Sequence, residues 1–106
     1  MTRRHAEHPE ASAELEAAAA WYEEQQPGLG HELFRAVAQT IAAIDRWPDA
    51  APEDQSSAGL PIQLRSRHLL RFPYRIIYLV HEGELVIVAY AHDRREPGYW
   101  DRRVGQ

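Results

Sequence analysis

The chain has 106 residues, a formal net charge of −4 and no cysteine. This length suits one compact domain spanning residues 1–106. Without cysteine there is no disulfide framework, no thiol nucleophile and no common zinc–thiolate site, and the residues indicate neither a metal nor another cofactor. No apolar run is long enough to cross a membrane, and the first ten residues lack the apolar core of a signal peptide, so we expect a cytoplasmic protein.

Charge is divided unevenly along the chain. Up to residue 56, four arginines stand against eleven acidic residues, whereas from residue 57 onward eight arginines stand against five. There is no lysine, and arginine is the side chain whose planar fork best matches phosphate or carboxylate. A cationic second half on an acidic whole favours a local anion site over general coating of nucleic acid.

The first half of the chain predicts a weak strand and two helices. Residues 2–7 alternate poorly and give at most a short edge strand. Pro9 fits the first turn of a helix that is rich in Ala, Leu and Glu and ends at Pro27-Gly28. A second helix is expected from about 29 to 47, with apolar residues at three- and four-residue steps. The short link between them predicts an antiparallel helical hairpin.

The second half predicts three strands after a surface loop over residues 48–61. Here the hydrophobic period changes to two, which indicates strands at 62–71, 74–81 and 85–92. Glu82-Gly83 suits a two-residue hairpin loop. The order β-α-α-β-β-β indicates an α+β fold, in which the helical hairpin packs on one face of a small, mainly antiparallel sheet.

A two-residue loop determines which residues share a face of the predicted hairpin. Tyr78 then opposes Ile87, on a nearly wholly apolar face that should lie against the helices. The opposite face has an apolar end made of four side chains: Ile77, Leu79, Val86 and Val88. Because such a patch is too apolar to remain in water comfortably, we expect a partner protein to cover it.

The same face gathers cationic groups at its other end. In the predicted register Arg75 opposes Tyr90, and His92 lies close by. Arginines of the neighbouring strand and of the tail are expected to join them, from among Arg65, Arg67, Arg71, Arg94 and Arg95. This clustering predicts a phosphate-sized anion site where the last strand ends.

Two of these residues have functional and structural interpretations. Arg75 could clamp a phosphate, or it could be a solvated arginine paired with Glu84 or Asp93. His92 could act as a general acid or base, although a strand-end histidine bonded to a backbone carbonyl explains it more simply.

The tail residues are open to the same choice. Arg94 and Arg95 could stabilise a pentacoordinate phosphate, or they could form salt bridges with the acidic residues around them. Tyr99 and Trp100 could stack on a nucleobase, but fixing the tail onto the domain explains them better.

Three stretches, in this order, resemble the RelE/ParE superfamily of type II toxins: WYEEQQPGLGHELFRAV, LLRFPYRIIYLV and VIVAYAHDRREPGYW. The most specific pieces are Phe72-Pro73-Tyr74 and the ending His92-x-Arg94-Arg95-x-Pro97. The resemblance covers nearly the whole chain. It implies a growth-inhibiting toxin of the plasmid-stabilisation type, neutralised by a cognate antitoxin that would cover the apolar patch.

The superfamily contains two kinds of target. ParE-like members inhibit DNA gyrase, whereas RelE-like members cleave messenger RNA in the ribosomal A site without a metal. The HDRREP ending and the acidic body resemble the ParE-like branch more, so gyrase is the expected target. RNA cleavage would assign catalysis to Arg75, Arg95, His92 and Tyr99. A degenerate toxin that only binds its antitoxin is the third interpretation.

Overall fold

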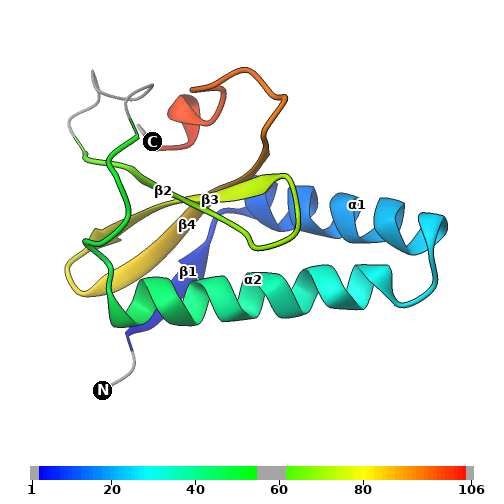
Figure 1. The fold of residues 1–106 in the computed structure, drawn as a ribbon. Coiled ribbons are helices and arrows are strands. Elements are labelled where there is room, and N and C mark those ends of the chain that lie inside the picture. The colour runs from blue at the N-terminus through cyan, green and yellow to red at the C-terminus, as the bar shows by residue number, and fades with distance from the viewer. Residues whose placement is uncertain (1–2, 55–61, 105–106) are drawn as a thin grey trace.

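The computed structural model describes residues 3–54 and 62–104, and its elements follow the predicted order. They are strand β1 (Arg4–Glu7), helices α1 (Pro9–Gln25) and α2 (Leu29–Arg46), strands β2 (Arg65–His68), β3 (Tyr74–His81) and β4 (Glu84–His92), and the short 3-10 helix η2 (Asp101–Arg103). The strand order is β1-β4-β3-β2, with β1 parallel to β4 and the other pairs antiparallel. The predicted α+β fold is confirmed (Figure 1).

The helical hairpin depends on contacts close to its turn. Helix α1 begins at Pro9, as predicted, and the turn between the helices contains Gly28. The Glu23 carboxylate accepts hydrogen bonds from the N–H groups of Gly28 (2.9 Å) and Gly30 (3.0 Å), which satisfies the start of α2. A Cβ at Gly30 would lie 2.7 Å from the Ala19 carbonyl oxygen, so glycine permits the close approach of the two helices.

The two faces of the sheet are covered by different parts of the chain. Figure 1 shows both helices on one side and the C-terminal segment, coloured orange to red, on the other. The larger core lies under the helices and includes Leu33, Ile44, Ile76 and Tyr78. A second core lies on the opposite face, where Trp100 is fully buried. The expectation that this tryptophan fixes the tail onto the domain is therefore confirmed.

The β3–β4 hairpin has the predicted turn. Glu82 (φ 50°) and Gly83 (φ 79°) both have positive φ, as a two-residue turn of type I′ requires. From this turn the predicted register holds as far as the pair Tyr78 and Ile87. The turn chemistry alone was therefore sufficient to align the first half of the hairpin.

Beyond that pair the register changes by one residue. The next pair is Ile77 with Ala89, so Val88 is inserted into β4 as a β-bulge. Because successive residues of a strand point to opposite faces, a single inserted residue reverses the alternation that follows. Residues 89–92 therefore face the side opposite to the predicted one.

Strand β2 is shorter than the predicted 62–71. Arg71 has a φ of 73°, and the chain turns there toward β3. On the outer edge of β2, the Ser66 N–H donates to the Pro52 carbonyl (3.1 Å), so the preceding loop partly covers this edge. The remainder of the predicted surface loop, residues 55–61, lies outside the described residues. In the described ranges no helix has the length and hydrophobicity needed to cross a membrane.

Candidate functional site

The predicted anion site does not assemble as one cluster. It required Arg75 and His92 on the same face of the sheet. In the structure Arg75 pairs with Ala91, whereas His92 pairs with Tyr74, which packs against the core under the helices. Arg75 and His92 therefore lie on opposite faces, and this prediction is wrong because the bulge at Val88 reverses the end of β4.

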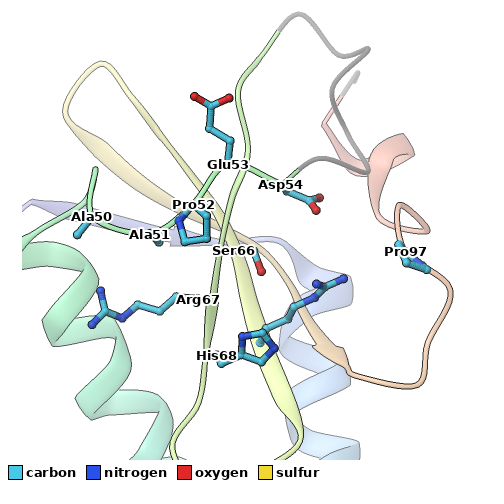
Figure 2. A pocket seen from close by; sticks show the side chains of 10 residues that line it. Ala50, Ala51, Pro52, Glu53, Asp54, Ser66, Arg67, His68 and Pro97 are labelled. Carbon is cyan, nitrogen blue, oxygen red and sulfur yellow. The ribbon is translucent and has the colours of Figure 1, made fainter.

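Arg75 lines a hollow on the face of the sheet that the helices do not cover. This sheet-face hollow has a volume of about 690 Å³, and it lies between β2, the loop before β2 and the tail (Figure 2). Its charged lining residues are Glu53, Asp54, Arg67, His68 and Arg75. Its uncharged lining residues include Ser66 and Pro97.

The Arg75 guanidinium has no carboxylate partner among the described residues. Its central carbon lies 5.5 Å from the centre of the Trp100 ring, a cation–π arrangement. Its Nε is buried and has no hydrogen-bond partner in the described part of the chain. His68, its cross-strand neighbour, has Nε2 3.5 Å from an oxygen of the Asp93 carboxylate. The Arg75 guanidinium is therefore available to an anionic group that enters the hollow.

Arg65 and Arg67 do not join this cation. Arg65 donates hydrogen bonds to the carbonyl oxygens of Ala51 (2.7 Å) and Asp49 (3.3 Å), so it holds the loop that precedes β2. Figure 2 shows the side chains of Arg67 and His68 leaving β2 in different directions. Both arginines therefore lie apart from the Arg75 guanidinium.

The other two arginines expected to contact the target are also separated from Arg75. Arg71 lies in the turn after β2, where its Nη2 is 3.6 Å from a carboxylate oxygen of Glu32 on α2. Arg94 is exposed beyond β4, and its backbone N–H donates to His92 Nδ1 at 3.0 Å. The expected cluster of arginines is thus dispersed over several surfaces of the domain.

His92, Arg95 and Tyr99 line a second hollow, of about 330 Å³, between α1 and the end of β4. We call it the α1 groove. On the helix side it is bounded by Ala17, Ala18 and Trp21, and on the other side by Tyr74, His92, Arg95 and Tyr99. The Arg95 guanidinium carbon lies 4.0 Å from the centre of the Tyr99 ring. The four residues considered for RNA cleavage are consequently divided between two hollows.

The apolar patch expected to bind the antitoxin is covered by the chain itself. Ile77, Leu79 and Val88 are buried and Val86 is half-buried, and all four pack in the second core with Trp100. The expectation that this patch is open is wrong, because the tail returns over it. Binding of an antitoxin to these residues stays a prediction, and it would require the tail to move.

Sequence reasoning missed a buried ion pair that holds this tail. Glu14 Oε1 and Oε2 accept hydrogen bonds from Arg103 Nη1 (2.9 Å) and Nη2 (3.1 Å). The Glu14 carboxylate also accepts from the Tyr90 backbone N–H (3.1 Å) and from the Tyr99 hydroxyl. Arg103 donates in turn to the Val88 carbonyl at 3.0 Å. We call Glu14, Tyr99 and Arg103 the C-terminal clasp.

The clasp stands where β4 has lost its neighbouring strand. Strand β1 ends at Glu7, opposite Ile87, so among the described residues no strand lies beside the outer edge of β4 beyond that point. Glu14 and Arg103 satisfy the exposed backbone groups there in place of a strand. The sequence signal for Glu14 is its spacing, because it lies three residues after Ala11 and four before Ala18, and both alanines are buried.

Burial changes the acid–base chemistry around the clasp. Burial, followed by the hydrogen bond to Glu14, raises the pKa of Tyr99 well above its ordinary value. The pKa of Tyr90 is raised in the same way by burial and by its hydroxyl bond to Glu7. On the surface, the hydrogen bond from Arg102 lowers the pKa of Glu10. In the described ranges, no three His, Cys, Asp or Glu side chains gather as a metal site.

Comparison with known proteins identifies a family and similar solved structures. The family model described as "ParE toxin of type II toxin-antitoxin system, parDE" matches residues 8–97. The structure of the "Chromosomal ParDE TA system from P. aeruginosa" superposes with a TM-score of 0.70 at 16% identity, covering 86% of this chain and 96% of that chain. At this identity the likeness shows the fold alone. No curated protein matches the chain.

Proposed function

The chain belongs to the ParE toxin family of type II toxin-antitoxin systems, and we propose that it arrests growth by binding DNA gyrase unless its antitoxin holds it inactive. A partner antitoxin follows from membership in a two-component system of this kind. The gyrase target is supported by the HDRREP ending, which resembles that of ParE-like members, and by the acidic first half of the chain.

The observation that carries the proposal is the separation of the residues that RNA cleavage would need. A proton acceptor, a proton donor and a cation must lie within hydrogen-bond reach of one phosphate. Arg75 lines the sheet-face hollow, whereas His92 and Arg95 line the α1 groove. Tyr99 donates its hydroxyl proton to Glu14, and its raised pKa opposes a role as proton carrier. This arrangement supports a toxin that acts by binding.

We propose that Arg75 contacts the target. Arg75 lines the sheet-face hollow and its guanidinium has no carboxylate partner among the described residues, so a carboxylate or phosphate of the target that enters the hollow would gain a charge-assisted contact there. Arg67 and Arg94 have no ion-pair partner in the described ranges, and they remain candidates for further contacts. Arg65 and Arg71 are already engaged within the domain.

The test is a supercoiling assay with purified gyrase and relaxed plasmid. The chain should block supercoiling in a dose-dependent manner, and Arg75→Ala should weaken inhibition by roughly tenfold, the effect of losing one charge-assisted contact. Arg35→Ala is the matched control, because Arg35 is an exposed arginine on α2, away from the hollow. Unimpeded supercoiling at a saturating concentration of the wild-type chain would reject the gyrase target.

Induced expression of the chain in growing cells separates the two alternatives. Cleavage of messenger RNA that Arg75→Ala abolishes would support a RelE-like ribonuclease, for which the free Arg75 guanidinium beside His68 is the favourable observation. Normal growth on overexpression, with intact supercoiling and intact message, would support a degenerate toxin that only binds its antitoxin.

A further inference from the structure

The α1 groove combines an aromatic interior with an open mouth. Tyr90 and Ala18 are buried within it, and Trp21 forms one wall with 57% of its surface exposed. Its volume of about 330 Å³ is at the lower limit for a small-molecule site and is sufficient for one large side chain and its neighbours. An exposed tryptophan beside buried aromatic residues is the arrangement that interface anchors typically occupy.

The charge at the mouth of the groove is positive. Arg95 is exposed and has no carboxylate partner among the described residues; its guanidinium lies over the Tyr99 ring. Glu14 also lines the groove, but its carboxylate is already bonded to Arg103 on both oxygens. The groove therefore presents apolar surface with one unpaired cation beside it, which suits an apolar side chain followed by a carboxylate.

A nucleic acid fits the groove less well. The Tyr99 ring is already approached by two guanidinium carbons, of Arg95 at 4.0 Å and of Arg103 at 5.2 Å, so a nucleobase would have to stack on Trp21. The exposed Glu24 follows Trp21 by three residues and so borders the same side of α1, where it would repel a phosphate backbone. The observations favour a protein segment.

We propose that the α1 groove is a docking site for the antitoxin, which inserts an apolar anchor side chain against Trp21 and pairs a neighbouring carboxylate with Arg95. This inference rests on the proposed function only in that it takes the chain to have an antitoxin. It does not depend on gyrase being the target. It also places the antitoxin on surface that is open in this structure, unlike the patch that the tail covers.

The experiment measures binding of the small protein encoded by the reading frame adjacent to the toxin gene. Trp21→Ala should weaken its binding about 30-fold or more, the effect expected for an interface anchor. Arg95→Glu should weaken binding about fivefold or more at low salt and less at high salt, because the contact is electrostatic. Trp47→Ala is the matched control, since Trp47 is 63% exposed at the end of α2, and it should bind within about threefold of wild type.

A second readout follows burial of the anchor directly. In Trp47→Ala, Trp21 is the exposed tryptophan and Trp100 is already buried, so complex formation should shift the fluorescence to shorter wavelength. Each variant is also tested for gyrase inhibition without antitoxin, and Trp21→Ala, which lies outside the HDRREP ending, should inhibit as wild type does. Failure of wild type to inhibit gyrase, with binding at the groove intact, would remove only the proposed target.

The docking proposal would be overturned by any of three results. The first is that the adjacent protein does not bind the wild-type toxin. The second is that Trp21→Ala and Arg95→Glu both bind it as the Trp47→Ala control does. The third is that the two groove variants lose gyrase inhibition while antitoxin binding is unchanged, which would assign the groove to the target. Denaturant unfolding of each variant excludes loss of binding through loss of fold.

Discussion

The C-terminal clasp should contribute much of the stability of this domain, and Glu14→Gln tests it. The substitution keeps the size of the side chain but removes the charge that faces Arg103. The Arg103 and Glu14 side chains are only 4% and 16% exposed, and their nitrogen and oxygen approach to 2.9 Å. Removing one partner of a fully buried pair costs about 3–5 kcal/mol, because the other charge stays buried without compensation.

The expected loss for Glu14→Gln is about 3 kcal/mol, at the lower end of that range. Glutamine keeps one acceptor oxygen for Arg103, and the site retains some contact with water. With a urea m-value of about 1–3 kcal/mol/M, the unfolding midpoint should fall by about 1–3 M. Trp100, buried under the tail, makes tryptophan fluorescence a suitable probe of the transition.

A neighbouring pair on the same two elements provides the control. Glu10 and Arg102 approach to 2.8 Å, but the Arg102 and Glu10 side chains are 66% and 42% exposed. Glu10→Gln should therefore cost much less than Glu14→Gln, because solvent screens the exposed pair. Arg103→Met combined with Glu14→Gln should recover part of the loss, since no buried charge then remains unpaired. A loss for Glu14→Gln no larger than that for Glu10→Gln would refute the reasoning.

Three further predictions concern the core and the tyrosines. Burial raises the pKa of all five tyrosines, so their contribution to folding stability is complete below the ordinary tyrosine pKa near 10 and is lost as the pH rises above it. In an alkaline titration the absorbance of tyrosinate should therefore appear together with unfolding. Ionisation of the tyrosines before the chain unfolds would contradict this. Trp100→Ala should lower the free energy of unfolding in urea by about 3–5 kcal/mol, because it leaves a cavity over Ile77. A decrease below about 1 kcal/mol would mean that the tail is not needed for the stability of the domain. Gly30→Ala should lower the melting temperature although alanine favours helices, because the new Cβ would meet the Ala19 carbonyl oxygen at 2.7 Å; a higher melting temperature would show that the helices separate easily.

Local signals were sufficient for the helices and for the first half of the hairpin. Pro9 and the Pro27-Gly28 link mark helix ends by removing a donor or by permitting positive φ, and these effects depend on neighbouring residues only. Glu82-Gly83 sets the hairpin register for the same reason. Such signals predict local structure well because their effect on the backbone does not depend on tertiary contacts.

The register beyond Val88 could not be obtained in this way. Residues 85–91 are apolar at nearly every position, so the alternation that normally fixes register is absent there. Either face of this segment can be buried, and both are, one under the helices and one under the tail. In the structure, the bulge at Val88 determines which residues at the end of β4 face the helices and which face the tail. It thereby places His92 on the face opposite to Arg75.

The tail connects the two hollows in a way that no short motif could reveal. The Trp100 ring lies 5.5 Å from the Arg75 guanidinium and 5.0 Å from the Tyr99 ring, so one side chain contacts a residue of the sheet-face hollow and a residue of the α1 groove. Arg103, which fixes this segment, is paired with Glu14 across 89 positions of sequence. The shape of both hollows therefore depends on a long-range ion pair. A substitution that opens the clasp should perturb the two hollows together, whereas one at Trp21 should perturb the groove alone.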